Sequence, residues 1–314
     1  MLEGLLWNAW VITATSTRRP SYLPAIEHIF ADAQDQHPAT QTSLSLECLL
    51  VRMLRMFKRN DLSLLLLEPR HDPAMIAHER SCLLRAGALQ PQQIVVHNLL
   101  EEPCDRSILK GHHAVVIGGT GDYSVANDRP DFFQPLVDLT QHLLEIGMPT
   151  LGLCYGHHLM AHAVGGKVQT RPDMGETGTF EMELTPEGRA DAILGHLPDR
   201  FLAQQGHNDV IMSLPDEFLV LARSQRCACQ ALRHLNKPFY GLQFHPELRR
   251  ADLMQRMLAY ADNYASTPER MREIEAIVRE TTIDDVIEKF IDRIVWPWAN
   301  EQDLPDRQSQ LQGD

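Results

Sequence analysis

A single stretch, residues 149–166, constrains the fold more than any other part of the chain. It reads P-T-L-G-L-C-Y-G-H-H-L-M-A-H-A-V-G-G. Residues 150–153 form a short apolar run with the character of a strand, and residues 159–164 favour a helix. Between them lies Cys154, with a glycine two positions away on each side, so that the backbone can turn sharply and lift the thiol clear. This order of strand, turn and helix predicts a nucleophile elbow.

A cysteine at such a turn lies at the N-terminus of a helix, where the partial positive charge favours thiolate over thiol. The thiolate is the species that attacks in cysteine nucleophilic catalysis. The alternative is a structural cysteine that ends a core strand, which is how most free cysteines behave. Because G-x-C-x-G is a short pattern, it does not decide between these two interpretations alone.

Apolar runs alternate with helical patterns on the N-terminal side of this stretch. Strands are expected at residues 64–67, 94–96 and 114–117, and helices at residues 74–86 and 132–146. This alternation predicts an α/β fold with a mainly parallel central sheet, right-handed crossovers and helices on both faces. Functional sites in such sheets lie at the carboxyl ends of the strands, where Cys154 and the glycine loop 118–121 would both fall.

Beyond residue 166 the pattern changes to short strands and turns. Strands are expected at residues 180–184, 219–222, 229–232 and 238–244. Helices are expected at residues 253–264 and 268–294, the second of them interrupted near Thr281-Thr282 and ended by Trp296-Pro297-Trp298.

The second chemical motif is His245-Pro246-Glu247. Proline holds the preceding residue in an extended conformation, and side chains two apart in an extended chain point the same way. The Glu247 carboxylate can therefore lie beside the His245 imidazole, fix its tautomer and stabilise the imidazolium. Together with Cys154 these residues make a set of nucleophile, base and orienting group. Without Cys154, the motif would be interpreted as a solvent-exposed turn.

The third motif is the loop Gly118-Gly119-Thr120-Gly121, which follows an expected strand. Glycines there let backbone N–H groups point into the site, and with the Tyr155 N–H they are suited to hold the oxyanion of a tetrahedral intermediate. A phosphate-binding loop is the competing interpretation, but no G-K-[ST] follows.

Composition excludes several classes of function. The net charge is −13 without a basic stripe, which argues against a nucleic-acid partner. The apolar runs are too short to span a bilayer, and we expect no membrane association. Six scattered cysteines fit a reducing compartment, and we expect a cytoplasmic protein without a cofactor. His158 and His162 lie four apart, but no acidic ligand accompanies them, and we expect no metal.

With these motifs in this order, the chain resembles the class I (triad-type) glutamine amidotransferases, which hydrolyse glutamine to glutamate and ammonia. The resemblance rests on the glycine loop 118–125, the elbow 152–156 and the G-L-Q-F-H-P-E motif 241–247. Residues 176–188 and 205–209 resemble stand-alone relatives of the glutamine-hydrolysing half of GMP synthase. The resemblance covers about residues 60–264 and implies a flavodoxin-like fold.

The resemblance also implies roles for individual residues. It makes Cys154 the nucleophile that forms a γ-glutamyl thioester, His245 the general base and acid, and Glu247 its orienting group. Backbone N–H groups of Gly119 and Tyr155 would hold the oxyanion. The remaining residues assigned to the oxyanion and substrate site are Gly118, His158 and His207.

Two positions depart from the family pattern. His158 stands where the family commonly has a glutamine that contacts the substrate. Asn208 stands where the family has a glycine, which predicts a left-handed backbone conformation for this asparagine.

The expected organisation has three parts: an N-terminal extension of unknown role at residues 1–57, the amidotransferase domain at 58–264, and a helical C-terminal tail at 265–314. One hypothesis is that Met53 or Met56 is the true start. No ATP-binding loop is found, and we expect ammonia to pass to a separate synthetase subunit or another acceptor. The first alternative is a γ-glutamyl amide or peptide hydrolase, which His158 favours. The second is a catalytically silent binding or regulatory protein, against which the complete triad argues.

Overall fold

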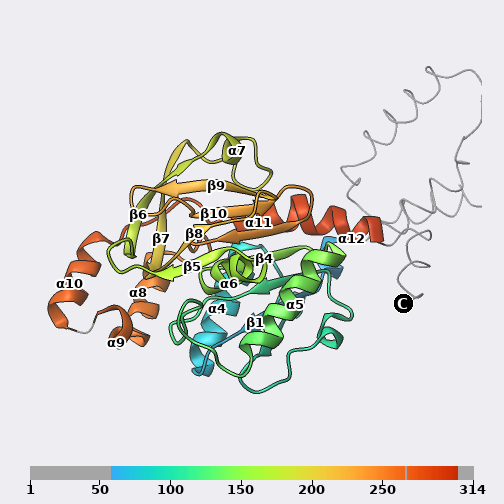
Figure 1. Ribbon diagram of the computed structural model, residues 1–314, viewed down its shortest axis with the longest axis horizontal. Coiled ribbons are helices and arrows are strands. Elements are labelled where there is room, and N and C mark those ends of the chain that lie inside the picture. Colours follow the sequence, from blue (N-terminus) through green and yellow to red (C-terminus); the bar gives the residue numbers. More distant parts are fainter. Residues whose placement is uncertain (1–57, 266, 303–314) are drawn as a thin grey trace, which may run out of the picture. The chain divides into compact units, whose positions relative to one another are not determined.

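The computed structural model describes residues 58–265 and 267–302. Within them a nine-stranded sheet has the order β2-β1-β3-β4-β11-β10-β9-β6-β7 (Figure 1). The first five of these are parallel: β2 (Ile94–Asn98), β1 (Leu64–Glu68), β3 (Ala114–Ile117), β4 (Thr150–Leu153) and β11 (Phe239–Leu242). The other four run antiparallel to their neighbours: β10 (Ala231–His234), β9 (Phe218–Ser224), β6 (Glu176–Leu184) and β7 (Arg200–His207).

The parallel half follows directly from the apolar runs. Every residue of β1, β3 and β4 is buried, as expected for strands covered on both faces. Alternate residues serve two different cores: Leu64 and Leu66 belong to one, and Leu65 and Leu67 to the other. The expected α/β fold with a parallel central sheet is confirmed.

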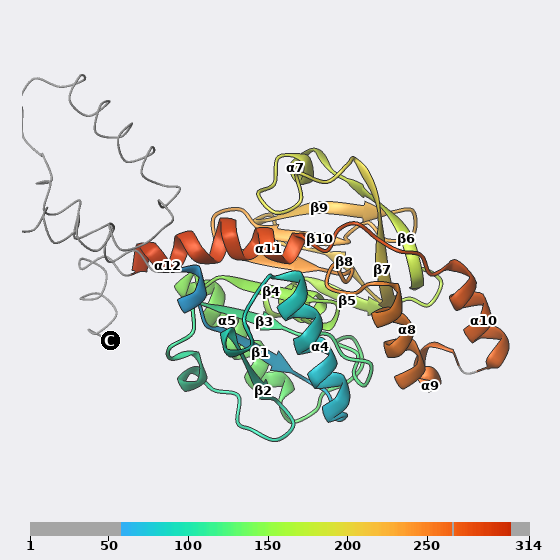
Figure 2. The same ribbon diagram turned by 180° about the vertical axis from the view of Figure 1, so that it is seen from behind.

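Helices cover both faces of this half. The helices α5 (Phe133–Ile146) and α6 (Tyr155–Ala163) lie in front of the sheet in Figure 1. From behind, Figure 2 shows α4 (Pro73–Ala86) and α11 (Val286–Phe290) on the opposite face. The helix expected at 159–164 begins earlier, directly after Cys154. That early start brings the N-terminus of α6 against the thiol.

The antiparallel half contains strands that the sequence pattern missed. These are β7, together with the separate two-stranded sheet of β5 (Lys167–Thr170) and β8 (Asp209–Ser213). In β7 the fully buried positions Gln204 and Gln205 are polar, so the strand lacks an apolar alternation. Their amides find partners inside the protein, Arg279 O for the first and Gln230 Oε1 for the second.

The C-terminal part is helical, and the break between α10 (Pro268–Ile277) and α11 includes residues 281–282, where it was expected, but two other details differ from the prediction. The helix expected at 253–264 is two helices, α8 (Arg250–Ala259) and α9 (Ala261–Tyr264). After α10, a second helical segment continues from α11 through the π-helical turn η4 (Ile291–Val295) into α12 (Trp296–Gln302).

Trp296-Pro297-Trp298 therefore does not end the helix, and that prediction is wrong. A proline inside an α-helix lacks an N–H and clashes with the carbonyl four residues earlier. The π-helical turn η4 lies directly before Pro297, and its backbone hydrogen bonds span five residues instead of four. This wider turn accommodates the proline, and the helix continues.

The remaining short helices are η1 (Arg59–Asp61), η2 (Pro91–Gln93), η3 (Arg106–Leu109) and α7 (Pro186–Arg189). None of the helices in 58–265 and 267–302 has the length and hydropathy needed for a bilayer span. The expectations for residues 1–57, including a start at Met53 or Met56, lie outside the described residues.

Candidate active site

Cys154 occupies a strained turn between β4 and α6. Its φ of 49° and ψ of −96° lie in a region that non-glycine residues rarely adopt. The flanking glycines leave no room for side chains: a Cβ at Gly152 would lie 2.6 Å from the Gly156 carbonyl carbon, and one at Gly156 would collide with the Ile117 carbonyl oxygen. The backbone at Cys154 thus has the geometry of a nucleophile elbow.

The sheet brings His245 to the same place. The strand β11 pairs in parallel with β4, with Leu242 opposite Leu153, so the chain leaves both strands at one edge of the sheet. The Cys154 N–H donates to the Leu242 carbonyl at 2.8 Å. The His245 imidazole lies beside Cys154, whose Sγ donates to the Gly206 carbonyl at 3.7 Å, and the imidazole Nδ1 lies 2.7 Å from Glu247 Oε1. The Cys154 side chain, the His245 imidazole and the Glu247 carboxylate are therefore neighbours in this order.

The surroundings of His245 favour the imidazolium. Burial by itself lowers the pKa of this imidazole, but the Glu247 carboxylate and the hydrogen bond with Cys154 outweigh it and raise the pKa to about 9. Glu247 is fully buried, so its charge is little screened by water. At neutral pH the ring is charged and can donate from both nitrogens.

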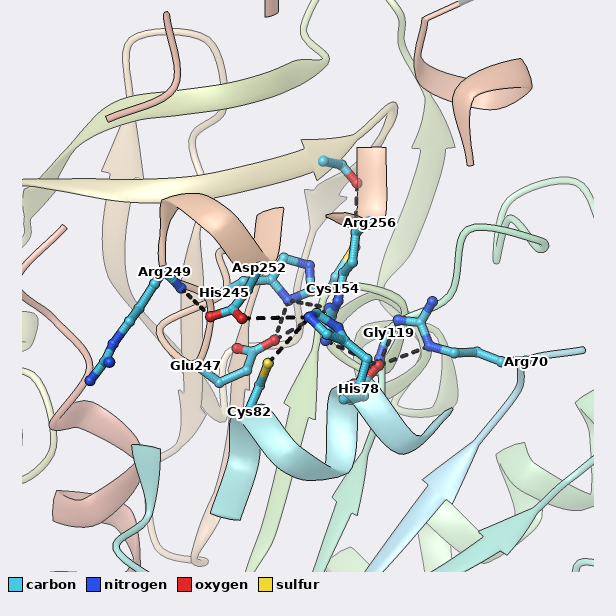
Figure 3. Close-up of polar contacts among 12 residues, drawn as sticks. Arg70, His78, Cys82, Gly119, Cys154, His245, Glu247, Arg249, Asp252 and Arg256 are labelled. Carbon is cyan, nitrogen blue, oxygen red and sulfur yellow. Dashed lines mark hydrogen bonds and ion pairs between the residues drawn. The ribbon is translucent and has the colours of Figure 1, made fainter. Parts of the chain in front are cut away.

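A buried ion-pair network lies behind this row, as Figure 3 shows. Arg256 of α8 joins two carboxylates, with Nη1 3.4 Å from Glu247 Oε1 and Nη2 3.5 Å from Glu79 Oε2. Arg70, which follows β1, lies 2.6 Å from the same Glu79 oxygen and 3.3 Å from Glu68 Oε2. The exposed fraction of these side chains is 6% or less. We call the five residues Glu68, Arg70, Glu79, Glu247 and Arg256 the ionic network.

The two carboxyls nearest Arg70 have opposite tendencies. Burial raises the pKa of Glu79, but Arg70 and Arg256 outweigh that effect and lower it to about 2. Burial and the neighbouring Glu79 charge raise the pKa of Glu68 well above its usual value. At neutral pH Glu79 is therefore the charged partner of both arginines, whereas Glu68 holds its proton more readily than an ordinary glutamate.

The glycine loop lies beside the thiol, with its N–H groups already engaged. A Cβ at Gly119 would lie 3.2 Å from His245 Cε1 and 3.6 Å from Cys154 Cβ. The Gly118 N–H donates to the Leu67 carbonyl at 3.0 Å, and the Gly119 N–H donates to Glu79 Oε1 at 3.0 Å. The Tyr155 N–H, at the first position of α6, has no partner within the helix. Of the expected oxyanion donors, Tyr155 is the one left available.

A cavity of about 370 Å³ opens on the other side of Cys154. The glycine loop, the start of α6, the end of β7 and the segment after α8 contribute to its wall. Its acidic lining residues are Asp122, Asp128, Asp209 and Asp262, and the wall contains no lysine or arginine. Tyr264 closes one side, where its hydroxyl donates to the Gly206 carbonyl at 3.1 Å.

His158 and His207 both line this cavity, with ring centroids 6.4 Å apart. Burial lowers the pKa of His158 to about 4, so its ring is neutral, and its Nε2 has no hydrogen-bond partner. His207 is held by the protein, through Asp209 O at 2.9 Å from Nδ1 and Glu176 Oε2 at 3.3 Å from Nε2. Of the two, His158 retains a nitrogen for a ligand.

Asn208 does not adopt the expected left-handed conformation, because in the described residues only Ala88 and Cys154 combine a side chain with positive φ. It stands between β7, which ends at His207, and β8, which begins at Asp209. Strand residues on both sides replace the glycine-dependent turn that the family pattern predicted.

Sequence reasoning missed Arg70, Glu79 and Arg256. Glu79 and Arg256 lie on helices that look amphipathic and ordinary, and Arg70 follows a strand in a turn. One signal was present: Glu68 ends the strand β1 after four leucines, and Arg70 follows two residues later, at the edge of the sheet where sites form.

Comparison with known proteins agrees with this geometry. The family model described as glutamine amidotransferase class-I matches residues 83–261. A glutamine-hydrolyzing GMP synthase subunit of Methanopyrus kandleri is 44% identical over 102 residues, covering 32% of this chain and 53% of that protein. The same subunit of Methanothermobacter thermautotrophicus is 34% identical over 146 residues, covering 46% of this chain and 71% of that protein.

The matched part of the chain thus spans 53% of the length of the first relative and 71% of the length of the second. Among solved structures, a glutamine amidotransferase of Thermotoga maritima matches with a TM-score of 0.57 and 20% identity, over 75% of this chain and 98% of that one. At this identity the structural match shows the fold alone. The family model covers more than half of the sequence, and the chain belongs to the class-I glutamine amidotransferase family.

Proposed function

We propose that the protein hydrolyses the side-chain amide of glutamine through a thioester on Cys154. The observation that carries this proposal is the row of Cys154, His245 and Glu247, in which Cys154 lines the cavity and lies on a strained elbow. Membership of the amidotransferase family supports the reaction class. The cavity volume of about 370 Å³ leaves room for an amino acid substrate.

In the first half of the reaction, the Cys154 sulfur attacks the amide carbon and forms a tetrahedral intermediate. The Tyr155 N–H holds the oxyanion. The His245 imidazolium donates its proton to the leaving nitrogen, so that the carbon–nitrogen bond breaks, ammonia departs and a γ-glutamyl thioester remains. A His245 pKa of about 9 suits this step, because the acid is already protonated at neutral pH.

In the second half, neutral His245 takes a proton from water, and the resulting hydroxide attacks the thioester. Glutamate leaves, and the thiolate and imidazolium are restored. Glu247 stabilises the imidazolium throughout, and Arg256 keeps that carboxylate in place through its contact at 3.4 Å.

The oxyanion site requires a second donor, and Gly119 is the candidate beside the thiol. Its N–H is bound to Glu79 Oε1 in this structure. For Gly119 to serve the intermediate, this peptide has to exchange the Glu79 carboxylate for the substrate oxygen. We therefore expect a low basal rate that rises when a partner or ligand shifts the loop.

For the ammonia acceptor, we propose a separate synthetase subunit. The relatives of this chain are named as one subunit of a glutamine-hydrolyzing GMP synthase, which supports a partnership of this kind. Co-purification from native cells tests it: a bound ATP-dependent synthetase is the expected result, and recovery of the chain free of any synthetase contradicts it.

The experiment that tests the reaction combines an assay with a covalent label. Glutamine is expected to be converted to equal amounts of glutamate and ammonia. The reactive analogue 6-diazo-5-oxo-L-norleucine is expected to modify the peptide that contains Cys154, with Cys104→Ser as the control that keeps the label. Absence of both turnover and label at Cys154 would exclude the proposal.

Hydrolysis of γ-glutamyl amides or peptides is the second candidate. His158 replaces the glutamine that contacts substrate in the family, and four carboxylates line the cavity without a lysine or arginine. Both features suit a substrate in which the group attached to the amide nitrogen carries a positively charged amine. Comparing kcat/KM for glutamine, γ-glutamylputrescine and γ-glutamyl-4-aminobutyrate tests this. A clear preference for the cationic amide supports the second candidate, whereas a preference for glutamine rejects it.

A further inference from the structure

A compact group of metal-ligand side chains lies where α4 packs against α8, separate from the cavity. His78 and Cys82 are one turn apart on α4, and Asp252 is in the first turn of α8. Their nearest ligand atoms all lie within 4.8 Å of one another. Figure 3 shows the contacts from His78 to Cys82 and to Asp252, close to Glu247.

The spacing of these atoms matches a tetrahedral site. Cys82 Sγ lies 3.7 Å from His78 Nε2, which in turn lies 3.5 Å from Asp252 Oδ1. Zinc forms bonds of about 2.3 Å to sulfur and about 2.0–2.1 Å to nitrogen and oxygen. In a tetrahedral site these bond lengths place sulfur and nitrogen about 3.6 Å apart, and nitrogen and oxygen about 3.4 Å apart. These two separations differ from the tetrahedral values by only about 0.1 Å, and the third, between Cys82 Sγ and the Asp252 carboxylate, is at most 4.8 Å.

The donor set selects the metal. One imidazole, one thiolate and one carboxylate suit borderline-soft Zn²⁺, whereas Mg²⁺ and Ca²⁺ prefer oxygen ligands alone. Three protein ligands leave the fourth position to water. The side chains of His78 and Asp252 are 9% and 17% exposed, so an ion can reach the site from solvent.

Some charges around the three ligands favour a bound cation, and others oppose it. Arg85 is paired with Asp252 through Oδ2, which leaves Oδ1 directed at His78. Arg85 and Arg256 oppose a cation, but a thiolate and a carboxylate together neutralise Zn²⁺. Burial raises the pKa of the Cys82 thiol to about 12, so binding forms the sulfur–metal bond and releases the thiol proton to solvent.

From this geometry we propose that His78, Cys82 and Asp252 bind one Zn²⁺ ion and that the ion fastens α4 to α8. The position has a consequence for the proposed triad. Arg85, which holds Asp252, also donates to the Glu247 carbonyl at 2.9 Å, and Glu79 and Arg256 are carried by the same two helices. A metal at this contact stabilises the arrangement of the helices on which the ionic network depends.

Cobalt binding tests the proposal, because tetrahedral Co²⁺ with a thiolate ligand gives visible d–d bands and a charge-transfer band in the near ultraviolet. The full chain with Cys154→Ala is used, so that the proposed nucleophile cannot act as a ligand. One equivalent of Co²⁺ is expected to produce both signals, and Zn²⁺ is expected to displace it. Zinc is also expected to raise the thermal unfolding temperature.

Three variants in this background locate the metal. Cys82→Ser is expected to abolish the charge-transfer band, and His78→Gln and Asp252→Asn to weaken binding by roughly tenfold or more. Cys104→Ser is the matched control and keeps both signals. Circular dichroism before metal addition shows which variants are folded. If the Cys82 variant does not fold, Asp252→Asn takes its place as the test, because asparagine retains a side-chain oxygen to cap α8. Absence of one-to-one binding, or unchanged spectra in folded variants, overturns the proposal.

Discussion

The two sides of Cys154 differ in almost every physical property. On one side, the ionic network consists of arginines and glutamates whose charges are paired and shielded from water. On the other side, the cavity is open, its wall bears four aspartates, and the buried His158 Nε2 has no protein partner. The charged groups of the network lie against one another at 2.6–3.5 Å, whereas the polar groups of the cavity wall surround a space that a ligand can enter.

This difference predicts a division of labour. The residues of the ionic network set the protonation and orientation of His245, and their loss should lower kcat and stability. Residues with unused hydrogen-bonding capacity meet the substrate, and their loss should change KM. The following variants are ordered by the size of the expected effect, and each one tests this division.

Cys154→Ala removes the group on which both sides depend. We expect glutamine turnover to fall on the order of 10⁵-fold or more, because loss of a covalent nucleophile removes the whole pathway. Steady-state ammonia release measures this, with Cys104→Ser as a control that retains activity. Substantial turnover in the alanine variant would mean that the thioester mechanism is incorrect.

Glu79→Gln tests the network side. The substitution keeps an oxygen for the Gly119 N–H but leaves Arg70 and Arg256 without their common counter-charge. Loss of one partner from a buried ion pair costs about 3–5 kcal/mol in the free energy of unfolding. Urea denaturation measures the change, and Glu183→Gln, on the exposed surface, is the matched control. A loss below about 1 kcal/mol would show that the network does not hold the fold together.

Glu247→Gln tests how the network sets the protonation of His245. We expect kcat to fall about 100-fold, because the imidazolium loses its main stabilising charge. The wild-type rate should decline above pH 9, where His245 loses its proton and ceases to act as an acid. In the variant this decline should occur at lower pH, since the remaining neighbours, Cys154, Arg256 and Glu79, do not replace the missing carboxylate. An unshifted profile would contradict the assignment.

His158→Gln tests the cavity side and should have the smallest effect. Glutamine is the residue that the family commonly has here, and its amide offers a donor as well as an acceptor to the substrate. We expect KM for glutamine to fall about tenfold, the equivalent of one hydrogen bond to a charged group, with kcat nearly unchanged. Initial rates over a range of glutamine concentrations measure both constants. A fall in kcat with constant KM would mean that His158 affects the chemical step, as the ionic network does, and not substrate binding.

Several parts of the fold were predictable because they depend on short-range patterns. Strands β1, β3 and β4 are continuous apolar runs, and the turn at Cys154 needs glycines at two fixed positions. The strand β7 was not predictable, since the amide nitrogens of its buried Gln204 and Gln205 find their acceptors only in residues distant in the sequence.

The candidate site divides in the same way. The motifs around Cys154 and His245 are visible in the sequence, and parallel pairing at one sheet edge makes their meeting a reasonable expectation. The hydrogen bond between Glu79 and the Gly119 N–H was not expected, because nothing in a helical pattern reveals which carboxylate points at a loop.

The sequence by itself determined the parallel half of the sheet, the elbow and the family, because strand character, turn geometry and motif spacing are properties of neighbouring residues. Tertiary structure decided which charges pair in the ionic network and where His78, Cys82 and Asp252 meet. Those contacts join side chains from α4 and α8, and their distances depend on how each helix is rotated and seated on the sheet. That rotation follows from the packing of whole surfaces, which no local pattern encodes.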